Sequence, residues 1–243
     1  MELSARIREV VGGSGDDGWG LYYRARALAA AGEEVLNLTI GDHDIKTDRL
    51  ILDAITAAME AGELGYTPVE GTPELRGAIA RRVAARTGVV TDPEDVVVTA
   101  GGQAGLFAAL MATLDPGQSC ILVEPHYATY AQTVRAVSGR PLAVAARPED
   151  GFEPDPAAVE AALAPDTRAI LINTPNNPTG AVYGRACLEG LADLCRRRGM
   201  WLISDEVYDT QVWEGEHLSP RALPGMTGHT IVVNSLSKSH AMT

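Results

Sequence analysis

The sequence predicts an α/β fold: a mostly parallel sheet covered by helices on both faces. Six short apolar runs recur along the chain: VVVT (96–99), CILV (120–123), PLAVAA (141–146), AILIN (169–173), WLIS (201–204) and IVVN (231–234). Segments long enough to form a helix separate most of these runs. Continuously apolar strands that alternate with helices are typical of parallel sheets buried on both sides.

Two helices are expected before the first of these runs. Residues 49–62 (RLILDAITAAMEAG) have helical apolar spacing and end at a glycine. Residues 72–88 (TPELRGAIARRVAARTG) begin with a threonine cap and carry a proline in the first turn. Further helices are expected at 103–114, 155–164 and 185–199. Residues 1–44 read as an arm with a glycine-rich break, GGSGDDGWG (12–20), and one apolar run, EVLNLTIG (34–41).

Composition and charge argue against several classes of protein. Hydrophobic residues make up 46% and charged residues 21%, the balance of an ordinary globular protein. The net charge of -12 argues against nucleic-acid binding, which needs clustered lysine and arginine. No run reaches the roughly 18 apolar residues of a membrane helix, so a cytoplasmic protein is expected. Cys120, Cys187 and Cys195 form no CxxC pair and are expected to be structural rather than metal ligands.

The residues that follow each apolar run are the candidates for a ligand site, because ligands of parallel sheets gather at the carboxyl ends of the strands. After VVVT come Gly101 and Gly102, where backbone amides at a helix N-terminus can face an anion. A tight strand-to-helix turn explains these glycines equally well. After CILV comes Tyr127, an aromatic ring that could stack on a flat ligand or simply pack.

The next strand end is followed by a loop rich in amides. TPNNPTG comes directly after the strand and, with the last residue of that run, crowds Asn173, Asn176 and Asn177 together. Pro178 restricts the backbone of Asn177, so the Asn177 side chain is a well-fixed donor. A surface turn is the alternative, since Asn, Pro and Gly all favour turns.

A carboxylate follows the strand at 201–204. Asp205 stands directly after that apolar run, where a buried carboxylate is costly unless it meets a cation or hydrogen-bond donors. Asp205 could instead cap a helix. If the segment is helical, Tyr208 lies on the same face, and both side chains can address one ligand.

The last strand end is followed by Lys238 among serines. Ser235, Ser237 and Ser239 surround this lysine. Lysine is usually a solvated surface residue, but one in a partly desolvated pocket can act as a neutral amine nucleophile. One molecule suits all five strand ends: pyridoxal 5′-phosphate has a phosphate for the glycines, a flat ring, a basic ring nitrogen, a phenolate-type oxygen and an aldehyde.

At this point the sequence resembles a known family. NNPTG (176–180), SDEVY (204–208) and SLSKSHA (235–241), in this order, are similar to the class I/II aminotransferases among the fold-type I pyridoxal-phosphate enzymes, and YTPVEGTPELR (66–76) resembles a segment of their large domain. The resemblance runs from about residue 35 to the last residue. It implies an N-terminal arm and small-domain segment at 1–44 and a cofactor-binding large domain at 45–243.

The resemblance also implies a role for each site residue. Lys238 would form the Schiff base and move the proton in transamination between an α-amino acid and a 2-oxo acid. Asp205 would pair with the ring nitrogen, Asn177 and Tyr208 would hold the ring oxygen, and Tyr127 would stack on the ring. The remaining residues would bind phosphate (Gly101, Gly102, Gln103, Ser235 and Ser237), reach the neighbouring subunit's phosphate in a homodimer (Tyr66), or lie near the substrate carboxylate (Gly41).

Two departures from the family pattern stand out. GDHDIKTD (41–48) lacks the proline that usually follows the acidic residue. An arginine that holds the phosphate normally comes eight residues after the lysine, whereas this sequence ends five residues after it. We therefore expect an incomplete large domain, no C-terminal small domain, and a chain that on its own is unstable and lacks measurable transaminase activity.

Three alternatives share part of the pattern. A C–S lyase, a decarboxylating enzyme or an α-oxoamine-forming enzyme of the same cofactor class would use most of these residues. A non-catalytic fragment that binds cofactor weakly would also contain them. A nucleotide-binding dehydrogenase fits poorly, because the GxGxxG motif and its partner acidic residue are missing.

Overall fold

The computed structural model describes residues 2–12, 19–41 and 44–243 of the chain. Most of the predicted glycine-rich break, and residues 42–43 of the predicted substrate-side loop, lie outside the described residues. The helices of the described part are α1 (Ala5–Gly12), α2 (Trp19–Ala30), α3 (Arg49–Glu60), α4 (Pro73–Thr87), α5 (Gly101–Thr113), α6 (Tyr130–Ala136), α7 (Pro156–Ala161), α8 (Arg185–Arg198) and α9 (Leu236–Ser239), with short 3-10 turns η1 (Pro93–Asp95), η2 (Pro148–Asp150) and η3 (Pro220–Ala222).

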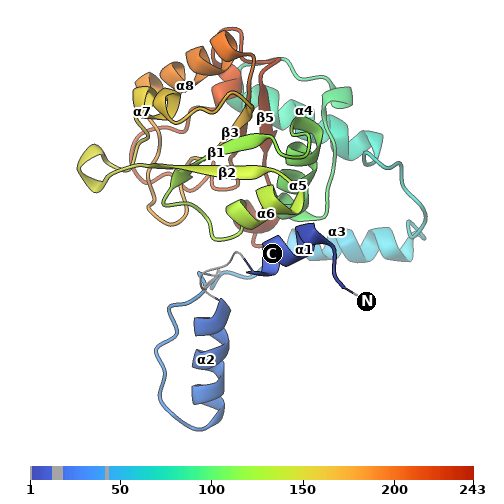
Figure 1. The fold of residues 1–243 in the computed structure, drawn as a ribbon. Helices are drawn as coiled ribbons and strands as arrows, with labels where there is room; N and C mark the ends of the chain where they lie inside the picture. Colours follow the sequence, from blue (N-terminus) through green and yellow to red (C-terminus); the bar gives the residue numbers. More distant parts are fainter. Residues whose placement is uncertain (1, 13–18, 42–43) are drawn as a thin grey trace.

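The described residues form one five-stranded sheet, which lies at the centre of the fold (Figure 1). Its strands are β1 (Ser119–Glu124), β2 (Arg140–Ala145), β3 (Thr167–Asn173), β4 (Trp201–Asp205) and β5 (Thr230–Val233). They lie in the order β2-β1-β3-β4-β5, and every neighbouring pair is parallel. The predicted α/β fold with a mostly parallel sheet is therefore confirmed.

The two faces of the sheet carry separate apolar clusters. One cluster joins α5 and α6 to strand residues such as Leu122 and Leu171. The other cluster joins α7 and α8 to Ile121 and Ile170, the strand residues that directly precede Leu122 and Leu171. Successive side chains of a strand point to opposite faces, so continuously apolar strands need a layer of helices on each side.

The run at 96–99 is not a strand, and that prediction was wrong. Val96 has an extended backbone, but the run pairs with none of the five strands of the described chain. Val98 donates its N–H to the carbonyl of Glu70 over 2.9 Å, and Val97 is 65% exposed. An extended run becomes a strand only where a neighbouring strand supplies hydrogen-bond partners.

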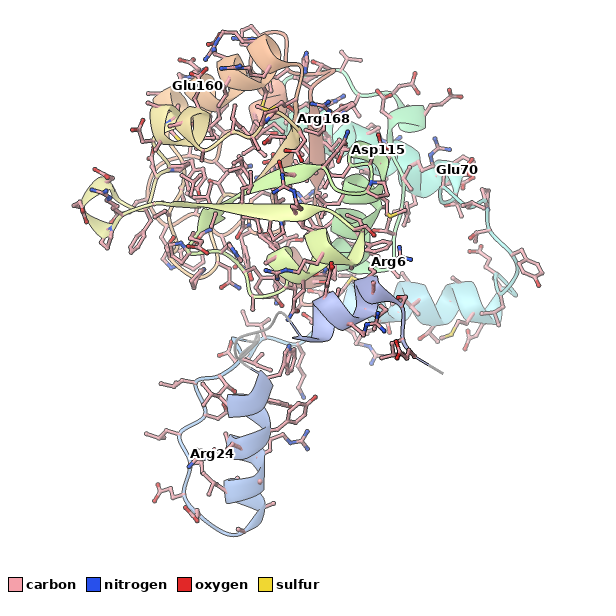
Figure 2. All side chains as sticks on the ribbon, viewed as in Figure 1. Arg6, Arg24, Glu70, Asp115, Glu160 and Arg168 are labelled. Atoms are coloured by element: carbon pink, nitrogen blue, oxygen red, sulfur yellow. The ribbon has the colours of Figure 1, made fainter. Side chains whose placement is uncertain are left out.

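The predicted threonine cap of the second helix is confirmed: Thr72 caps α4 by accepting the N–H of Leu75. Asp48, which the sequence analysis did not single out, caps α3 by accepting the N–H of Leu50, and α3 ends at Glu60, two residues before the predicted glycine stop. Gly88 ends α4 in the left-handed region, with φ 70°. Neither α2 nor α3 contributes a buried residue, and α2 stands well away from the sheet, as its labelled Arg24 shows (Figure 2).

The three cysteines are buried free thiols. Burial raises the pKa of each thiol to about 12, so they remain protonated near neutral pH. No group of three metal-ligating side chains occurs among the described residues. Within the same part of the chain, no helix combines the length and apolar character that crossing a membrane requires.

Candidate active site

Several of the predicted site residues follow strands that end at one edge of the sheet: Tyr127 follows β1, Asn177 follows β3, Tyr208 follows β4, and Ser235, Ser237 and Lys238 follow β5. Because β1, β3, β4 and β5 are parallel, their carboxyl ends lie side by side. In register, Asn173 at the end of β3 is opposite Asp205 at the end of β4, and Asp205 is opposite Val233 at the end of β5. The loops that leave these strands begin at the same edge.

Asp205 is a buried carboxylate with two donors. Tyr130 Oη donates to its Oδ2 over 2.5 Å, and the N–H of Val207 donates to its Oδ1 over 3.2 Å. Burial raises the pKa of Asp205 to about 6, the two hydrogen bonds act in the opposite direction, and the neighbouring Glu206 carboxylate adds to the rise. Residues 207–210 form turns, so Asp205 does not cap a helix.

Asn177 and Tyr208 come together although no helix places them. Asn177 Nδ2 donates to Tyr208 Oη over 3.2 Å. Asn173 fixes the position of Asn177, because Asn173 Oδ1 accepts the N–H of Asn177 over 2.7 Å. Asn173 is itself held in place, since its Nδ2 donates to the carbonyl of Asp205 over 3.0 Å. Burial raises the pKa of Tyr208 above its usual value, and the hydrogen bond from Asn177 offsets part of that rise.

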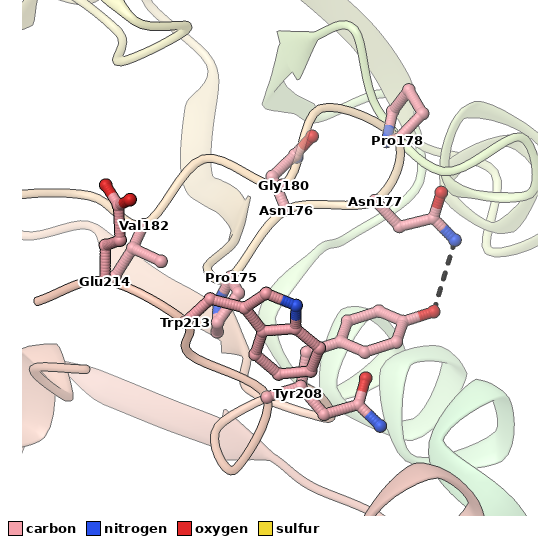
Figure 3. A pocket seen from close by; sticks show the side chains of 10 residues that line it. Pro175, Asn176, Asn177, Pro178, Gly180, Val182, Tyr208, Trp213 and Glu214 are labelled. Carbon is pink, nitrogen blue, oxygen red and sulfur yellow. Dashed lines mark hydrogen bonds between the residues drawn. The ribbon is translucent and has the colours of Figure 1, made fainter. Parts of the chain in front are cut away.

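A cavity of about 680 Å³ opens beside this pair (Figure 3). Its lining includes Asn177 and Tyr208, the backbone turn at Gly180, and Gln211, Trp213 and Glu214 from the segment after β4. The volume suits a small organic molecule. Of the predicted site residues, Asn177 and Tyr208 line this cavity, whereas Asp205, Lys238 and the glycines of α5 are not part of its lining.

The N-terminus of α5 has the form of an anion site. Ala100 provides no side-chain cap, so the first amides of α5 have no such partner, and Gly101 has φ +81°. A Cβ at Gly102 would lie 3.3 Å from Val207 Cγ1 and 3.8 Å from Ser235 Cβ. The first turn of α5 thus faces the first turn of α9.

The Gln103 side chain is already bonded within the protein. Its Nε2 donates to Thr133 Oγ1 over 2.7 Å, and its Oε1 accepts from Thr129 Oγ1 over 2.8 Å. This leaves the backbone N–H as the group that Gln103 can present to a phosphate.

Lys238 lies in the short helix α9, which begins at Leu236 and is capped by Ser235. The Ser235 hydroxyl accepts the N–H of Ser237 and donates to the Ser237 hydroxyl over 2.8 Å. The Lys238 side chain is half-buried and has no hydrogen-bond or ion-pair partner among the described residues. The Lys238 carbonyl accepts from Gln211 Nε2 over 3.4 Å, which links α9 to the cavity wall.

Three further predicted residues are less enclosed. Tyr127 is 40% exposed, and its ring meets that of Tyr130 edge to face at 5.9 Å. Tyr66 is fully exposed, and Gly41 is exposed with no atom within 4 Å of a Cβ built on it. The structure brings neither Tyr66 nor Gly41 against the other site residues, although Thr47 donates to the carbonyl of Ala241 near Lys238.

Sequence reasoning missed Tyr130, the main donor to Asp205. Tyr130 is three residues after Tyr127, and its separation from Asp205 is 75 residues, so no local pattern joins them. Sequence reasoning also missed Glu206, which is buried beside Asp205 and bonded to His217 and Ser219. The signal that the sequence offered for Glu206 was a charged residue directly after the end of a buried apolar strand.

Comparison with known proteins matches this arrangement to one family. The family model for aminotransferase class I and II matches residues 33–243. The chain is 44% identical over 233 residues to arginine–pyruvate transaminase of Pseudomonas aeruginosa, covering 96% of this chain and 59% of that protein. It is 40% identical over 221 residues to aspartate/prephenate aminotransferase of Thermus thermophilus, covering 90% and 57%.

Solved structures agree with the sequence matches. Aspartate aminotransferase from Thermus thermophilus with maleate superposes with a TM-score of 0.93 at 37% identity, covering 100% of this chain and 62% of that one. The Thermotoga maritima aspartate aminotransferase gives 0.94 at 38% identity, covering 99% and 64%. The chain thus spans about three fifths of the length of these relatives. Enzymes of this family use pyridoxal phosphate. With a family model that covers residues 33–243, this chain belongs to the aminotransferase class I and II family.

Proposed function

We propose that this chain is the cofactor-binding part of a pyridoxal-phosphate-dependent aminotransferase. The observation that carries the proposal is Asp205, a buried carboxylate at the end of β4, which Asn173 links to Asn177 and so to the Asn177–Tyr208 pair. Lys238 follows the neighbouring strand β5. The proposed substrates are an α-amino acid and a 2-oxo acid. Residues 45–243 are the cofactor-binding unit and residues 1–44 an arm, in a cytoplasmic protein.

The residues present fit the cofactor in three places. The first turn of α5, with Gly101 and Gly102, has no side-chain cap and suits a phosphate. Ser235 and Ser237 add hydroxyls from the facing turn of α9. The raised pKa of Asp205 reports a buried carboxylate without a cation, which a protonated ring nitrogen would supply.

The cofactor, when bound, supplies an aldehyde for amines and a ring that withdraws electrons from the substrate's α-carbon. Asp205 would keep a proton on the ring nitrogen, which would maintain that withdrawal. Asn177 Nδ2 and Tyr208 Oη would donate to the ring oxygen and fix the orientation of the ring, and Tyr127 would cover its face. Lys238 Nζ would be the amine that holds the cofactor and the base that moves the proton at the substrate's α-carbon.

A homodimer completes the proposal. Tyr66 is fully exposed, so its phenol is free to reach the phosphate site of a second subunit. The apolar side chains of α3 support a covered surface here, since Leu50 is 78% exposed and Met59 48% exposed. Gly41, on the same arm as α2, is the proposed neighbour of the substrate carboxylate.

Other reactions of the same cofactor class remain alternatives, because a C–S lyase would use the same residues. Product analysis separates them: a transaminase interconverts amino acids and oxo acids in two half-reactions. A non-catalytic fragment would bind cofactor without turnover.

Covalent trapping tests the proposal directly. Lys46 and Lys238 are the chain's two lysines, so labelling has two possible outcomes on side chains. Borohydride reduction after adding pyridoxal phosphate should attach the cofactor to the peptide containing SLSKSHAMT, and Lys238→Ala should abolish this label. Label on Lys46, or equal label in the Lys238→Ala variant, would contradict the assignment.

A further inference from the structure

The segment from Glu206 to Ser219 is closed at its two ends by buried polar contacts. Ser219 Oγ donates to Glu206 Oε1 over 2.7 Å, and His217 Nε2 lies 3.0 Å from Glu206 Oε2. Glu206 is 4% exposed and Ser219 is 5% exposed. Each carboxylate oxygen of Glu206 therefore has one partner from the far end of the same segment.

The middle of this segment forms part of the cavity wall. Tyr208, Gln211, Trp213 and Glu214 all line the cavity. Residues 213–216 are exposed, and Trp213 is 84% exposed, so packing into the core does not hold this stretch. Its position depends on the residues where it enters and leaves the protein.

A buried carboxylate is costly unless it is well bonded, so Glu206 requires an explanation. Contact between Glu206 and the molecule that Asp205 would bind cannot explain its burial, because the two side chains lie on opposite faces of the sheet. Asp205 contacts Tyr130 of α6, on the face that carries the cluster of α5 and α6. Side chains of adjacent residues in a strand point to opposite faces, and Glu206 continues β4 by donating its N–H to the carbonyl of Val233 over 2.8 Å.

The surroundings of Glu206 agree with this placement. Leu218, between its two partners, packs against the opposite cluster, the one built on α7 and α8. His217 Nδ1 is buried with no partner in the part of the chain that the structure describes, so the ring is held by its contact with Glu206. The residue after Tyr208 provides a second anchor. Asp209 forms an ion pair with Arg86 of α4, with Nε and Oδ2 2.8 Å apart.

We propose that Glu206 is a positioning residue that, through His217 and Ser219, closes residues 206–219 into a fixed loop and thereby holds Tyr208 and the cavity wall in place. The effect on cofactor binding rests on the proposed function, whereas closure of the loop does not. Loosening either partner contact should free the exposed stretch and weaken the Tyr208–Asn177 contact.

The test compares His217→Leu, His217→Gln and Ser219→Ala with the parent chain. A glutamine can present an N–H where His217 Nε2 lies, so His217→Gln is the conservative variant. The first readout is cleavage by a glutamate-specific protease after Glu214 and Glu216, which needs no cofactor. The second is an absorbance titration with pyridoxal phosphate. His229→Leu is the matched control, because His229 is a partly buried histidine bonded to the Met200 carbonyl outside this loop.

We expect His217→Leu and Ser219→Ala to speed cleavage and to raise the half-saturating cofactor concentration about tenfold, the effect of losing one buried hydrogen bond. We expect His217→Gln and His229→Leu to stay close to the parent. Unchanged cleavage in His217→Leu and Ser219→Ala would overturn the proposal. Equal acceleration by His229→Leu would also overturn it, because the effect would then be general destabilisation. If the parent binds no cofactor, the proposed function fails while the cleavage result still decides whether the loop is closed.

Discussion

Asp205 shows how single contacts set the chemistry of this site. Burial raises its pKa to about 6, while the hydroxyl of Tyr130 and the N–H of Val207 favour the charged form. The carboxylate is therefore mostly ionised at neutral pH and becomes neutral as the pH falls through about 6. Position after an apolar strand was enough to predict Asp205 as a site residue. Its pKa could not be predicted, because Tyr130 reaches it only through the fold.

Cofactor binding should depend on pH through this carboxylate. A protonated ring nitrogen is attracted by ionised Asp205 and not by the neutral acid, so affinity should fall as the pH drops below about 6. One unit below the pKa, about a tenth of the carboxyl groups remain ionised, so this contribution weakens about tenfold. Titrations with pyridoxal phosphate at pH 7 and pH 5 should show the loss in the parent and a smaller change in Asp205→Asn. An equal change in both would mean that Asp205 does not meet the ring nitrogen.

Tyr130→Phe provides a second arm of the same experiment. Its hydrogen bond lowers the pKa of Asp205, so its removal should move the midpoint of the pH dependence upward. Tyr183→Phe is the matched control, because Tyr183 is an equally buried tyrosine that packs on the opposite face of the sheet. A midpoint that moves down in Tyr130→Phe, or moves equally in Tyr183→Phe, would contradict this account.

At the scale of elements, local patterns predicted which segments form strands and helices but not whether each strand finds a partner. AILIN (169–173) and VVVT (96–99) look alike in the sequence, yet the first is β3 at the middle of the sheet and the second is unpaired. Strand pairing is a non-local property, so composition could not distinguish them. The loop closed by Glu206 was hidden for the same reason, since its partners are 11 and 13 residues away.

The proposed phosphate site depends on close approach between α5 and α9. Gly102→Ala places a methyl group 3.3 Å from Val207 Cγ1 and 3.8 Å from Ser235 Cβ, between the two first turns. Alanine favours a helix by about 1 kcal/mol over glycine, so α5 itself should not weaken. We expect at least about tenfold weaker binding of pyridoxal phosphate in an absorbance titration, because the methyl group displaces a bonded phosphate oxygen.

Gly77→Ala in α4 is the control for this substitution. It is also a glycine-to-alanine change within a helix, and its Cβ would make an ordinary 3.4 Å contact with the end of the Arg81 side chain. Its cofactor affinity should match that of the parent. Parent-like affinity in Gly102→Ala would place the phosphate elsewhere.

At the scale of the whole molecule, the chain exposes more surface than a compact monomer of its size. Its accessible surface is 14514 Å² for 25.6 kDa. A compact monomer of that mass exposes about 10,000 Å², so the excess on this one chain is about 4,000 Å², more than the roughly 1,000–2,500 Å² that each partner typically contributes to an obligate interface. Part of it lies on α3, whose apolar side chains are exposed, and part on the unpaired run at 96–99. This surface needs a covering partner, and without one the chain should self-associate.

Val97→Lys tests whether the unpaired run drives that association. Val97 is 65% exposed on an extended segment that pairs with none of the strands in the described part of the chain, and β5 offers an open edge to the sheet, since β4 is its one partner among them. Unpaired edges template pairing between chains, and a lysine on such an edge opposes it. Light scattering of the isolated 243-residue chain should show association that grows with concentration, and Val97→Lys should reduce it. Val90→Lys is the matched control, because Val90 is 90% exposed but lies before η1, outside the unpaired run. If both lysines reduce association equally, the added charge alone explains the effect. If the parent chain remains monomeric at all concentrations, the excess surface is stable in water and the prediction is wrong.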